Sequence, residues 1–454
     1  MKPIALAEIA RAVGARNAIN PMITGICTDT RKLSPGCLFI AIKGPNFDGH
    51  TFVKTALKQG AAAVLCQDET ACGEQALLVP DTRAALLKLA AYYRRLFGVK
   101  VVGITGSVGK TTTKEMTAAV LASTFKVLKN AGNLNNEIGL PMTVFELDDS
   151  YEAAVLEMGM SGLGEISRLS NASAPDIGVI TNVGVSHIEK LGSKANILKA
   201  KMEILDGMPQ GAPLLLNADD SLLRKAETGG HPVFYYGIEN AACDFNACNI
   251  EQSTSNTHFT ILSKGVEQRI DLPAIGRHNI YNALAAFAAG ILAGVSPKDA
   301  ATALADYAPA GMRQRIKHFG GITFIEDCYN ASPDSMHAAL VVLADLQAER
   351  RIAVLGDMLE LGDYAEQTHV EIGARAAEND VDVLLTFGEL TKLTAQKAKE
   401  SGVGTVLAFD NKNRLAAALC DILSPGDAVL FKASRGMGLE DIIEMVYREL
   451  KVDE

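Results

Sequence analysis

Residues 101–114, VVGITGSVGKTTTK, combine residue types and spacings that bind nucleotide phosphates. An apolar run is followed by glycines at every third position and then by a lysine and a threonine: Gly103, Gly106, Gly109, Lys110 and Thr111. Glycine lets backbone N–H groups approach phosphate oxygens, and the start of a helix favours an anion. The lysine adds positive charge, and a threonine hydroxyl beside it can reach Mg²⁺. The pattern predicts a strand, a phosphate loop and a helix.

The spacing of this loop departs from the general rule G-x-x-x-x-G-K-[ST]. Ile104 stands five residues before Gly109, where that rule requires a glycine. From this stretch alone, two interpretations stay open: a loop that binds ATP or GTP, and a glycine-rich turn that binds nothing. No Asn-Lys-x-Asp guanine signature occurs in the chain, which argues against a GTPase.

Two more polar side chains follow strands that the sequence predicts. Glu157 closes the apolar run 153–158, and His187 comes after the run 177–182. The carboxyl ends of parallel strands share one edge of a sheet, where α/β proteins bind ligands. Glu157 is therefore a candidate Mg²⁺ ligand, whereas His187 is either a ligand or an ordinary loop histidine.

Asparagines gather at two other places. The segment 130–141 holds four of them and two glycines, which predicts a loop whose amides satisfy turns or bind a polar substrate. Asn279 and Asn282 open a helix predicted to end near residue 292, and their spacing puts both amides on one side of its first turn. Paired amides of this kind suit the edge of an adenine ring.

These residues need an α/β framework of several domains to position them. Strand-like runs and helical patterns alternate along the chain, which indicates βαβ units and parallel sheets. At 454 residues the chain exceeds the size of one hydrophobic core. We place one boundary after residue 81 and another after residue 312. The last segment, 313–454, has a Rossmann-like alternation but no Gly-x-Gly-x-x-Gly, so a dinucleotide cofactor is not indicated.

Composition excludes several classes of protein. Hydrophobic residues make up 48% and charged residues 21%, as in a globular enzyme, and the net charge of −10 argues against a nucleic-acid partner. The eight cysteines form no C-x-x-C pair and are expected as free thiols. We find neither a signal peptide nor a membrane-spanning run, so we expect a cytoplasmic protein without stable membrane insertion.

The order of motifs resembles that of the Mur ligases, the ATP-dependent amide-forming enzymes of peptidoglycan precursor synthesis. The likeness covers nearly the whole chain and rests on these segments: TGSVGKTTTKE, NLNNEIGLP, EMG, NVGVSHIE, KAKMEIL, NADD and GRHNIYNALAA. Three C-terminal segments resemble the branch of the family that adds D-alanyl-D-alanine: DCYNASPDSM, LGDMLELGDYAEQTH and KASRGMGLED. The Asp-Asn-Pro-Arg motif of the branch that adds the third amino acid is absent from the sequence.

The resemblance implies a domain for each substrate. Residues 1–81 would bind the UDP-linked substrate, residues 82–312 would form a P-loop-type ATPase domain with a mostly parallel sheet, and residues 313–454 would form the Rossmann-like domain. The substrates would be ATP, UDP-N-acetylmuramoyl-tripeptide and D-alanyl-D-alanine, joined through an acyl phosphate by a monomer. Another step of the same pathway, or a folylpolyglutamate-type ligase, is the alternative.

The resemblance also assigns residues to roles. The residues implied for ATP are Gly106, Ser107, Val108, Gly109, Lys110, Thr111, Thr112, Asn279, Asn282, Arg313 and Asp327. Those implied for the other substrates are Thr30, Arg31, Phe47, Asp48, His50, Asn135, Asn136, Lys432 and Ser434. Mg²⁺ would be held by Thr111, Glu157, His187 and Lys201, with Lys201 carbamylated. Catalytic roles would fall to Lys110, Lys201 and His187.

Overall fold

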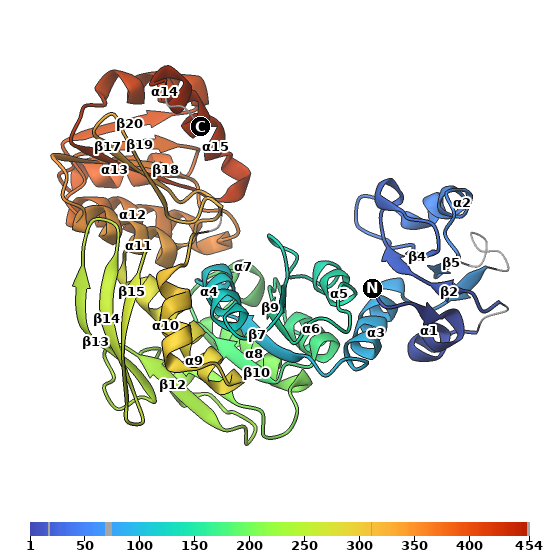
Figure 1. Cartoon of the computed structure of the whole chain (residues 1–454). Helices are drawn as coiled ribbons and strands as arrows, with labels where there is room; N and C mark the ends of the chain where they lie inside the picture. The colour runs from blue at the N-terminus through green and yellow to red at the C-terminus, as the bar shows by residue number, and fades with distance from the viewer. Residues whose placement is uncertain (17–18, 69–74, 310, 452–454) are drawn as a thin grey trace.

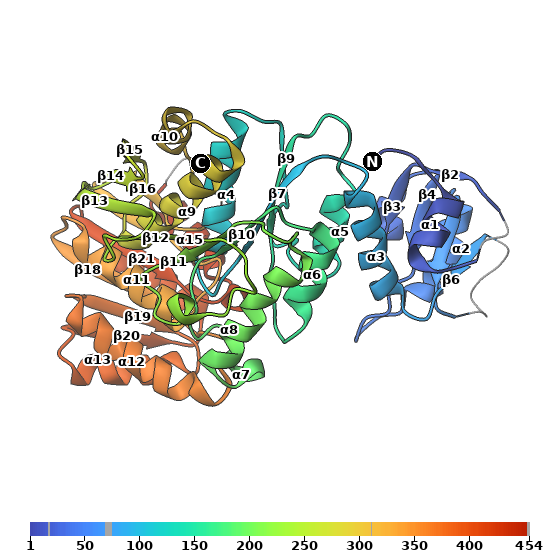
Figure 2. The ribbon, with the colours of Figure 1, turned by 90° about the horizontal axis from the view of Figure 1, so that it is seen from below.

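Three sheets of four or more strands follow one another along the chain in the computed structural model (Figure 1). The structure describes residues 1–16, 19–68, 75–309 and 311–451. The N-terminal region contains a four-stranded sheet, the central region a nine-stranded sheet and the C-terminal region a six-stranded sheet. The N-terminal and C-terminal sheets lie at opposite ends of the central one (Figures 1 and 2). The predicted α/β class with three sheet-based units is confirmed.

The N-terminal sheet is parallel, and both of its faces are buried. Its strands, in spatial order, are β3 (Gly25–Cys27), β4 (Cys37–Ile40), β5 (Ala63–Cys66) and β6 (Ala76–Leu78). A two-stranded antiparallel sheet and two helices accompany them: β1 (Ile4–Ala5), β2 (Met22–Ile23), α1 (Leu6–Val13) and α2 (Val53–Lys58). Leu38 and Phe39 enter different hydrophobic clusters because successive side chains of a strand point to opposite faces.

The central sheet carries the phosphate loop at one of its inner strands. Its spatial order is β15 (Val266–Leu272), β14 (Thr257–Ser263), β13 (Phe245–Gln252), β12 (Val233–Gly237), β11 (Leu214–Asn217), β10 (Ile177–Ile180), β7 (Lys100–Thr105), β9 (Ala153–Glu157) and β8 (Val127–Lys129). The strands from β13 to β8 run parallel, and β14 and β15 add an antiparallel hairpin at the edge. The short strands between residues 233 and 272 are thus part of the central sheet.

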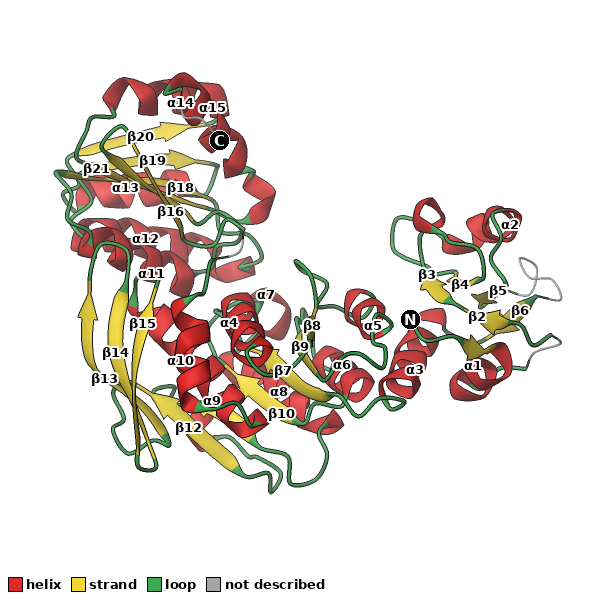
Figure 3. Cartoon of the chain, in the orientation of Figure 1, coloured by secondary structure: helices red, strands yellow, loops and turns green. Residues whose placement is uncertain are grey.

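Helices cover both faces of the central sheet, so its strands are apolar on both sides (Figure 3). Val101 packs into one cluster and Val102 into the other, and Ala154 and Val155 divide in the same way. The helices of the first cluster are α3 (Thr82–Arg94), α5 (Gly139–Val144), α6 (Glu165–Ser173), α7 (Ile188–Leu191) and α8 (Lys194–Met202). Those of the second are α4 (Lys110–Ala122), α9 (Arg277–Ala293) and α10 (Pro297–Ala305). The strand ends are left for polar loops.

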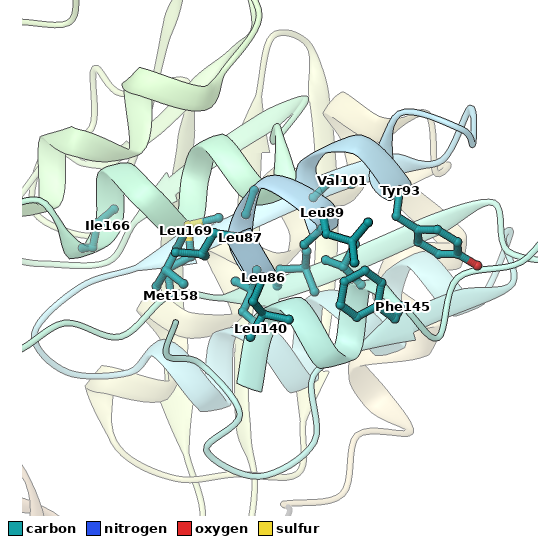
Figure 4. Close-up of a cluster of buried hydrophobic side chains, with 14 of the residues drawn as sticks. Leu86, Leu87, Leu89, Tyr93, Val101, Leu140, Phe145, Met158, Ile166 and Leu169 are labelled. Carbon is teal, nitrogen blue, oxygen red and sulfur yellow. The ribbon is translucent and has the colours of Figure 1, made fainter. Parts of the chain in front are cut away.

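Helix α3 joins the N-terminal sheet to the central one. A continuous cluster runs from Leu38 and Leu65 of the N-terminal sheet through Leu86 and Leu89 of α3 to Val101 of β7. Figure 4 shows the α3 side chains packed beside residues of α5 and α6. The boundary that we predicted after residue 81 therefore lies inside a shared apolar core, and it stays a prediction about domain limits.

The C-terminal sheet is parallel except at one edge. Its order is β16 (Arg315–Phe319), β17 (Ile322–Glu326), β21 (Asp427–Lys432), β18 (Arg350–Gly356), β19 (Val383–Phe387) and β20 (Thr405–Phe409), with β16 antiparallel. Its helices are α11 (Pro333–Asp345), α12 (Ala365–Glu378), α13 (Thr391–Glu400), α14 (Lys412–Ile422) and α15 (Leu439–Glu449). These helices pack on both faces of the C-terminal sheet. Ala353 and Val354, which are successive residues of β18, accordingly belong to different hydrophobic clusters.

The structure bears on two expectations drawn from composition, which concern the cysteines and membrane-spanning helices. Six cysteines are free, namely Cys27, Cys37, Cys243, Cys248, Cys328 and Cys420. The expectation of a free thiol is wrong for Cys66, which is disulfide-bonded, and Cys72 lies outside the described residues. Within the described ranges, none of the helices combines the length and apolar character that crossing a bilayer requires.

Arg94, at the end of α3, stabilises the connection between α3 and β7 through hydrogen bonds. Its guanidinium is buried and donates to the carbonyls of Ser173, Phe97 and Val99, and to Asp176 Oδ2 at 3.1 Å. The same Asp176 oxygen accepts from Val101 N at the start of β7. One side chain therefore satisfies three backbone carbonyls and a carboxylate beneath the phosphate-loop strand.

We expect Arg94→Met to lower the free energy of unfolding by about 2–4 kcal/mol, because buried acceptors and a carboxylate lose their donor. Urea denaturation of the variant measures this loss. The exposed neighbour Arg95 provides the control, and Arg95→Met should unfold as the parent does. Equal midpoints for the two variants would contradict the anchoring role of Arg94.

Candidate active site

A cleft of about 920 Å³ lies between the central and C-terminal sheets. Loops that follow strands of both sheets line it, as expected for open parallel sheets. The predicted site residues in its lining are Ser107, Val108, Gly109, Lys110, Thr111, Thr112, Asn135, Asn136, Glu157, His187, Asn279, Asn282, Arg313, Asp327, Lys432 and Ser434. The structure thus brings together residues that lie more than 300 positions apart in sequence.

The phosphate loop between β7 and α4 depends on two glycines. Gly109 has φ 85°, and a Cβ there would lie 2.5 Å from Asn282 Oδ1. At Gly106 a Cβ would lie 1.8 Å from Thr181 Oγ1. Asn182 fastens the loop from the end of β10, because its Oδ1 accepts from Val108 N at 2.9 Å and its amide donates to Val108 O at 3.0 Å. The loop is therefore held by close contacts that exclude side chains.

Lys110 points back over this loop. Its Nζ donates to Gly106 O at 2.8 Å and to Ser107 O at 3.2 Å. Burial lowers the pKa of Lys110, the Glu157 carboxylate opposes that shift, and Arg313 adds to it. The amine thus stands at the centre of the loop with two other charged groups within electrostatic reach.

Glu157, at the end of β9, is joined to three segments of the central region. Its Oε2 accepts from Thr111 Oγ1 at 2.8 Å, and its Oε1 accepts from Asn135 Nδ2 at 2.8 Å. Asn130 pairs with the backbone N–H and C=O of Glu157. The predicted carboxylate, hydroxyl and asparagine loop therefore meet, and they present oxygen atoms to the cleft.

Lys114, which sequence reasoning did not single out, supports this carboxylate. It is fully buried, and its Nζ donates to Asn130 O at 2.8 Å and lies 3.8 Å from Glu157 Oε2. It also lies 3.1 Å from Glu115 Oε1. The motif TGSVGKTTTKE contains this lysine, but its spacing gives no sign that the side chain turns inward under the loop.

His187 belongs to the edge of the cleft where the central and C-terminal regions touch. Its Nδ1 lies 3.0 Å from Glu360 Oε2, and both residues have left-handed backbones, with φ 62° and 63°. Nearby, Val185 N donates to Asp334 Oδ2 at 3.3 Å, and a Cβ at Gly362 would lie 2.7 Å from Glu189 Cγ. The two regions are thus in direct contact beside His187.

Lys201 lies behind the cleft and not in its lining. Its side chain is 1% exposed, and no hydrogen bond or ion pair reaches its amine from the residues that the structure describes. Burial lowers the pKa of Lys201 well below the ordinary value, and the Lys110 charge adds to the shift. Burial also lowers the pKa of His187, with further contributions from Lys110 and Lys201. A neutral amine is therefore favoured at Lys201.

Asn279 and Asn282 face the cleft from the first turn of α9. Asn282 Nδ2 donates to Asn279 Oδ1 at 3.1 Å, and Asn279 Nδ2 donates to Gln314 Oε1 at 2.6 Å. His278 Nε2 lies 2.9 Å from the same Gln314 oxygen. Gln314 and His278 were not predicted, and they complete a polar edge that starts in the central region and ends in the C-terminal one.

The C-terminal side of the cleft is positively charged. Arg313 lies over the Tyr329 ring with 4.0 Å between guanidinium carbon and ring centroid, and Arg435 lies over the same ring at 5.3 Å. Lys432 is buried and pairs with Asp327, with 2.6 Å between Nζ and Oδ2. Tyr329 and Arg435 stand in segments that we quoted for their family likeness, yet no pattern within those segments marked them.

The predicted N-terminal residues form a separate group outside this cleft. Asp29 Oδ2 accepts from Arg31 Nη2 at 2.7 Å, which lowers the pKa of Asp29 to about 2. Thr30 begins the short helix that contains Arg31. The Arg31 side chain is 87% exposed and the Phe47 side chain is exposed. An arginine paired with Asp29 and an aromatic ring are thus exposed on this domain.

Asp48 and His50 are more constrained. Asp48 Oδ1 accepts from His50 N at 3.0 Å and lies 2.5 Å from His50 Nδ1. The other ring nitrogen accepts from Gln67 N at 3.0 Å, and the histidine is buried. Asp48 therefore caps the short helix Gly49–Phe52, and its contact with His50 shapes this loop.

Family models match all three regions of the chain. They are the Mur ligase family, catalytic domain, at residues 22–94, the Mur ligase middle domain at 104–290, and the Mur ligase, glutamate ligase domain, at 312–435. The chain belongs to the Mur ligase family.

Individual relatives match the chain over nearly its full length. The UDP-N-acetylmuramoyl-tripeptide--D-alanyl-D-alanine ligase of Bacillus subtilis is 44% identical, with 93% of each chain covered. MurF from Acinetobacter baumannii superposes with a TM-score of 0.92 at 30% identity and 99% coverage of both chains. MurF ligase from Thermotoga maritima, solved in complex with ADP, gives a TM-score of 0.86 at 29% identity, with 94% of this chain and 98% of that chain covered.

We expect Gly109→Ala to weaken ADP binding by about 5- to 150-fold, on the order of 1–3 kcal/mol, because the new Cβ meets Asn282 and its left-handed backbone is strained. Isothermal titration with ADP measures the effect. Gly211 is the matched control, since it has φ 82° and a Cβ there would have no atom within 4 Å. Gly211→Ala should bind ADP as the parent does, and similar losses in both variants would show that close packing at Gly109 is unimportant.

Proposed function

We propose that this protein is the ATP-dependent ligase that joins D-alanyl-D-alanine to UDP-N-acetylmuramoyl-tripeptide in peptidoglycan synthesis. The proposal rests above all on the cleft, where a phosphate loop with Lys110 faces the C-terminal region across one space. The near full-length relatives of this activity support it. The enzyme belongs to the class of ligases that join an acid to an amino acid.

The reaction takes place in two steps. The terminal carboxylate of the tripeptide attacks the γ-phosphorus of ATP, the bond to the bridging oxygen breaks, and ADP and an acyl phosphate form. The amine of D-alanyl-D-alanine then attacks the acyl carbon, phosphate leaves, and the amine loses a proton to solvent as the amide forms. Lys110 stabilises the negative charge that gathers on the phosphoryl group in both steps.

The protein contributes mainly by positioning its substrates. An α-amino group with pKa ~7.7–8.0 is about 10% neutral at pH 7, which costs only about 1.4 kcal/mol. Holding the reactants close together and correctly oriented lowers the activation free energy by roughly 7–11 kcal/mol. Asn279 and Asn282 would hold the adenine, and Arg313 and Asp327 would contact the phosphate and ribose of ATP. Arg31 with Phe47 would hold the UDP part on the N-terminal domain. We therefore assign no dedicated general base.

The oxygen atoms around Glu157 fit Mg²⁺. The described residues contain no cluster of three His, Cys, Asp or Glu side chains, but Mg²⁺ commonly uses one or two carboxylates together with substrate phosphates. Thr111 and Glu157 would hold one ion, with their oxygens 2.8 Å apart, and His187 lies across the cleft for a second. Such ions would neutralise phosphate charge and polarise the transferred group.

Lys201 fits a carbamate. A neutral lysine amine attacks CO₂, a C–N bond forms and one proton leaves, so the cation becomes an anion. Burial and the neighbouring Lys110 charge already favour the neutral amine. An anion there would offset the charge of Lys110 and would give the second Mg²⁺ an oxygen ligand beside His187.

The proposed activity predicts a specific pattern of phosphate release. With UDP-N-acetylmuramoyl-tripeptide and ATP, phosphate should appear only when D-alanyl-D-alanine is added, and Lys110→Ala should lower the rate at least about a hundredfold. Amino acids used by other ligases of the family, and glutamate, serve as alternative acceptors. Release that depends on one of those acceptors instead would identify a different member of the fold.

Lys201→Ala should lose at least about a hundredfold in activity, because one metal ligand and one compensating charge disappear. Formate or acetate should restore part of the rate. In ¹³C-bicarbonate, the parent should show a carbamate resonance that the variant lacks. Lys199→Ala is the control, since this exposed lysine lies on the same helix. An active Lys201→Ala variant, or a parent without the resonance, would refute the carbamate.

A further inference from the structure

Four Lys or Arg side chains appear in the described lining of the cleft, and they differ in exposure and in the contacts that they make. Lys110 lies on the carbonyls of the phosphate loop, and Lys432 is paired with Asp327. Arg313 lies over Tyr329 and immediately precedes Gln314, which joins the asparagine edge of α9. Arg435 is the fourth.

Arg435 is open to a ligand. Its side chain is 64% exposed, and its ion-pair partner Glu440 lies 3.8 Å away. Tyr329 supports the guanidinium from one side at 5.3 Å. A guanidinium that is held by an aromatic ring but keeps free N–H groups is well suited to bind a carboxylate through two hydrogen bonds.

A hydrogen bond joins the loop that carries Arg435 to a loop that carries a negative charge. Leu359 N donates to Ser434 Oγ at 2.9 Å, so the loops after β18 and β21 lie side by side. The residues that follow in the two loops are Glu360 and Arg435, and both line the cleft. Glu360 also contacts His187, so the negative end of this pair lies toward the central region.

An exposed leucine belongs to the same pair of loops. Leu359 is 44% exposed in the cleft, and its Cδ1 would be 2.9 Å from a Cβ at Gly436. The absence of a side chain at Gly436 therefore lets Leu359 lie flat against the loop that carries Arg435. Small apolar groups of a ligand fit over this leucine.

We propose that Arg435 binds the terminal carboxylate of the acceptor dipeptide, with Leu359 beneath its methyl groups and Glu360 on the side of its amine. The inference rests on the proposed function and adds the subsite for its acceptor. The opposite orientation would set the dipeptide carboxylate against Glu360, which like-charge repulsion disfavours. The orientation adopted directs the amine toward His187 and the phosphate loop.

The test compares D-alanyl-D-alanine with its C-terminal amide. The parent should use the amide at least about tenfold less efficiently, since a charge-assisted hydrogen bond is lost. Arg435→Gln should raise KM for the acid about 10–100-fold while leaving KM for ATP unchanged, and it should no longer distinguish acid from amide. Arg435→Lys should restore part of the distinction.

Arg448→Gln is the matched control, because this exposed arginine lies on α15 outside the cleft. It should keep the parental preference for the acid. If the parent accepts the amide as well as the acid, or if Arg435→Gln still prefers the acid to the parental degree, the carboxylate subsite is wrong. A parent that makes no product with D-alanyl-D-alanine would instead refute the proposed function.

Discussion

The structure depends on providing partners for one buried carboxylate. Glu157 is 2% exposed, and an ionised carboxylate at that depth requires hydrogen-bond donors and a nearby cation. Thr111, Asn135 and Lys114 supply them from α4 and from the asparagine-rich loop. The position of α4, and hence of the phosphate loop before it, is therefore tied to the end of β9.

The glycines of the phosphate loop also fix the position of this loop, because their backbone lies in close contact with neighbouring residues. Asn282 of α9 comes so close to Gly109 that only hydrogen fits, and Asn282 also accepts from Thr113 of α4. One asparagine thus links the phosphate loop to the polar edge shared with Gln314. The nucleotide part of the cleft is one connected network that extends from β9 to the first residues of the C-terminal region.

Local sequence patterns predicted those parts of the site whose structure depends on residues close together in the sequence. The phosphate loop, Glu157 at a strand end and the paired asparagines of α9 follow from glycine spacing, strand periodicity and helical geometry. The family resemblance added Arg313, Asp327 and Lys432, which no local pattern marks. The strand and helix alternation also predicted the fold class, because strands that are buried on both faces read as continuous apolar runs.

The remaining residues could not be predicted because distant contacts define them. Lys114 looks like a solvent-facing helical lysine until α4 packs against the asparagine loop. The loops that carry Glu360 and Arg435 are joined by a hydrogen bond between residues 75 positions apart. Likewise, α3 reads as a linker helix in sequence, whereas its core is continuous with both sheets beside it.

The left-handed backbones of His187 and Glu360 couple loop shape to the contact between regions. Each conformation costs on the order of 1 kcal/mol for a residue with a side chain. Their mutual contact at 3.0 Å helps to hold both. The shapes of the two loops, one from each region, therefore depend on how the central and C-terminal regions meet.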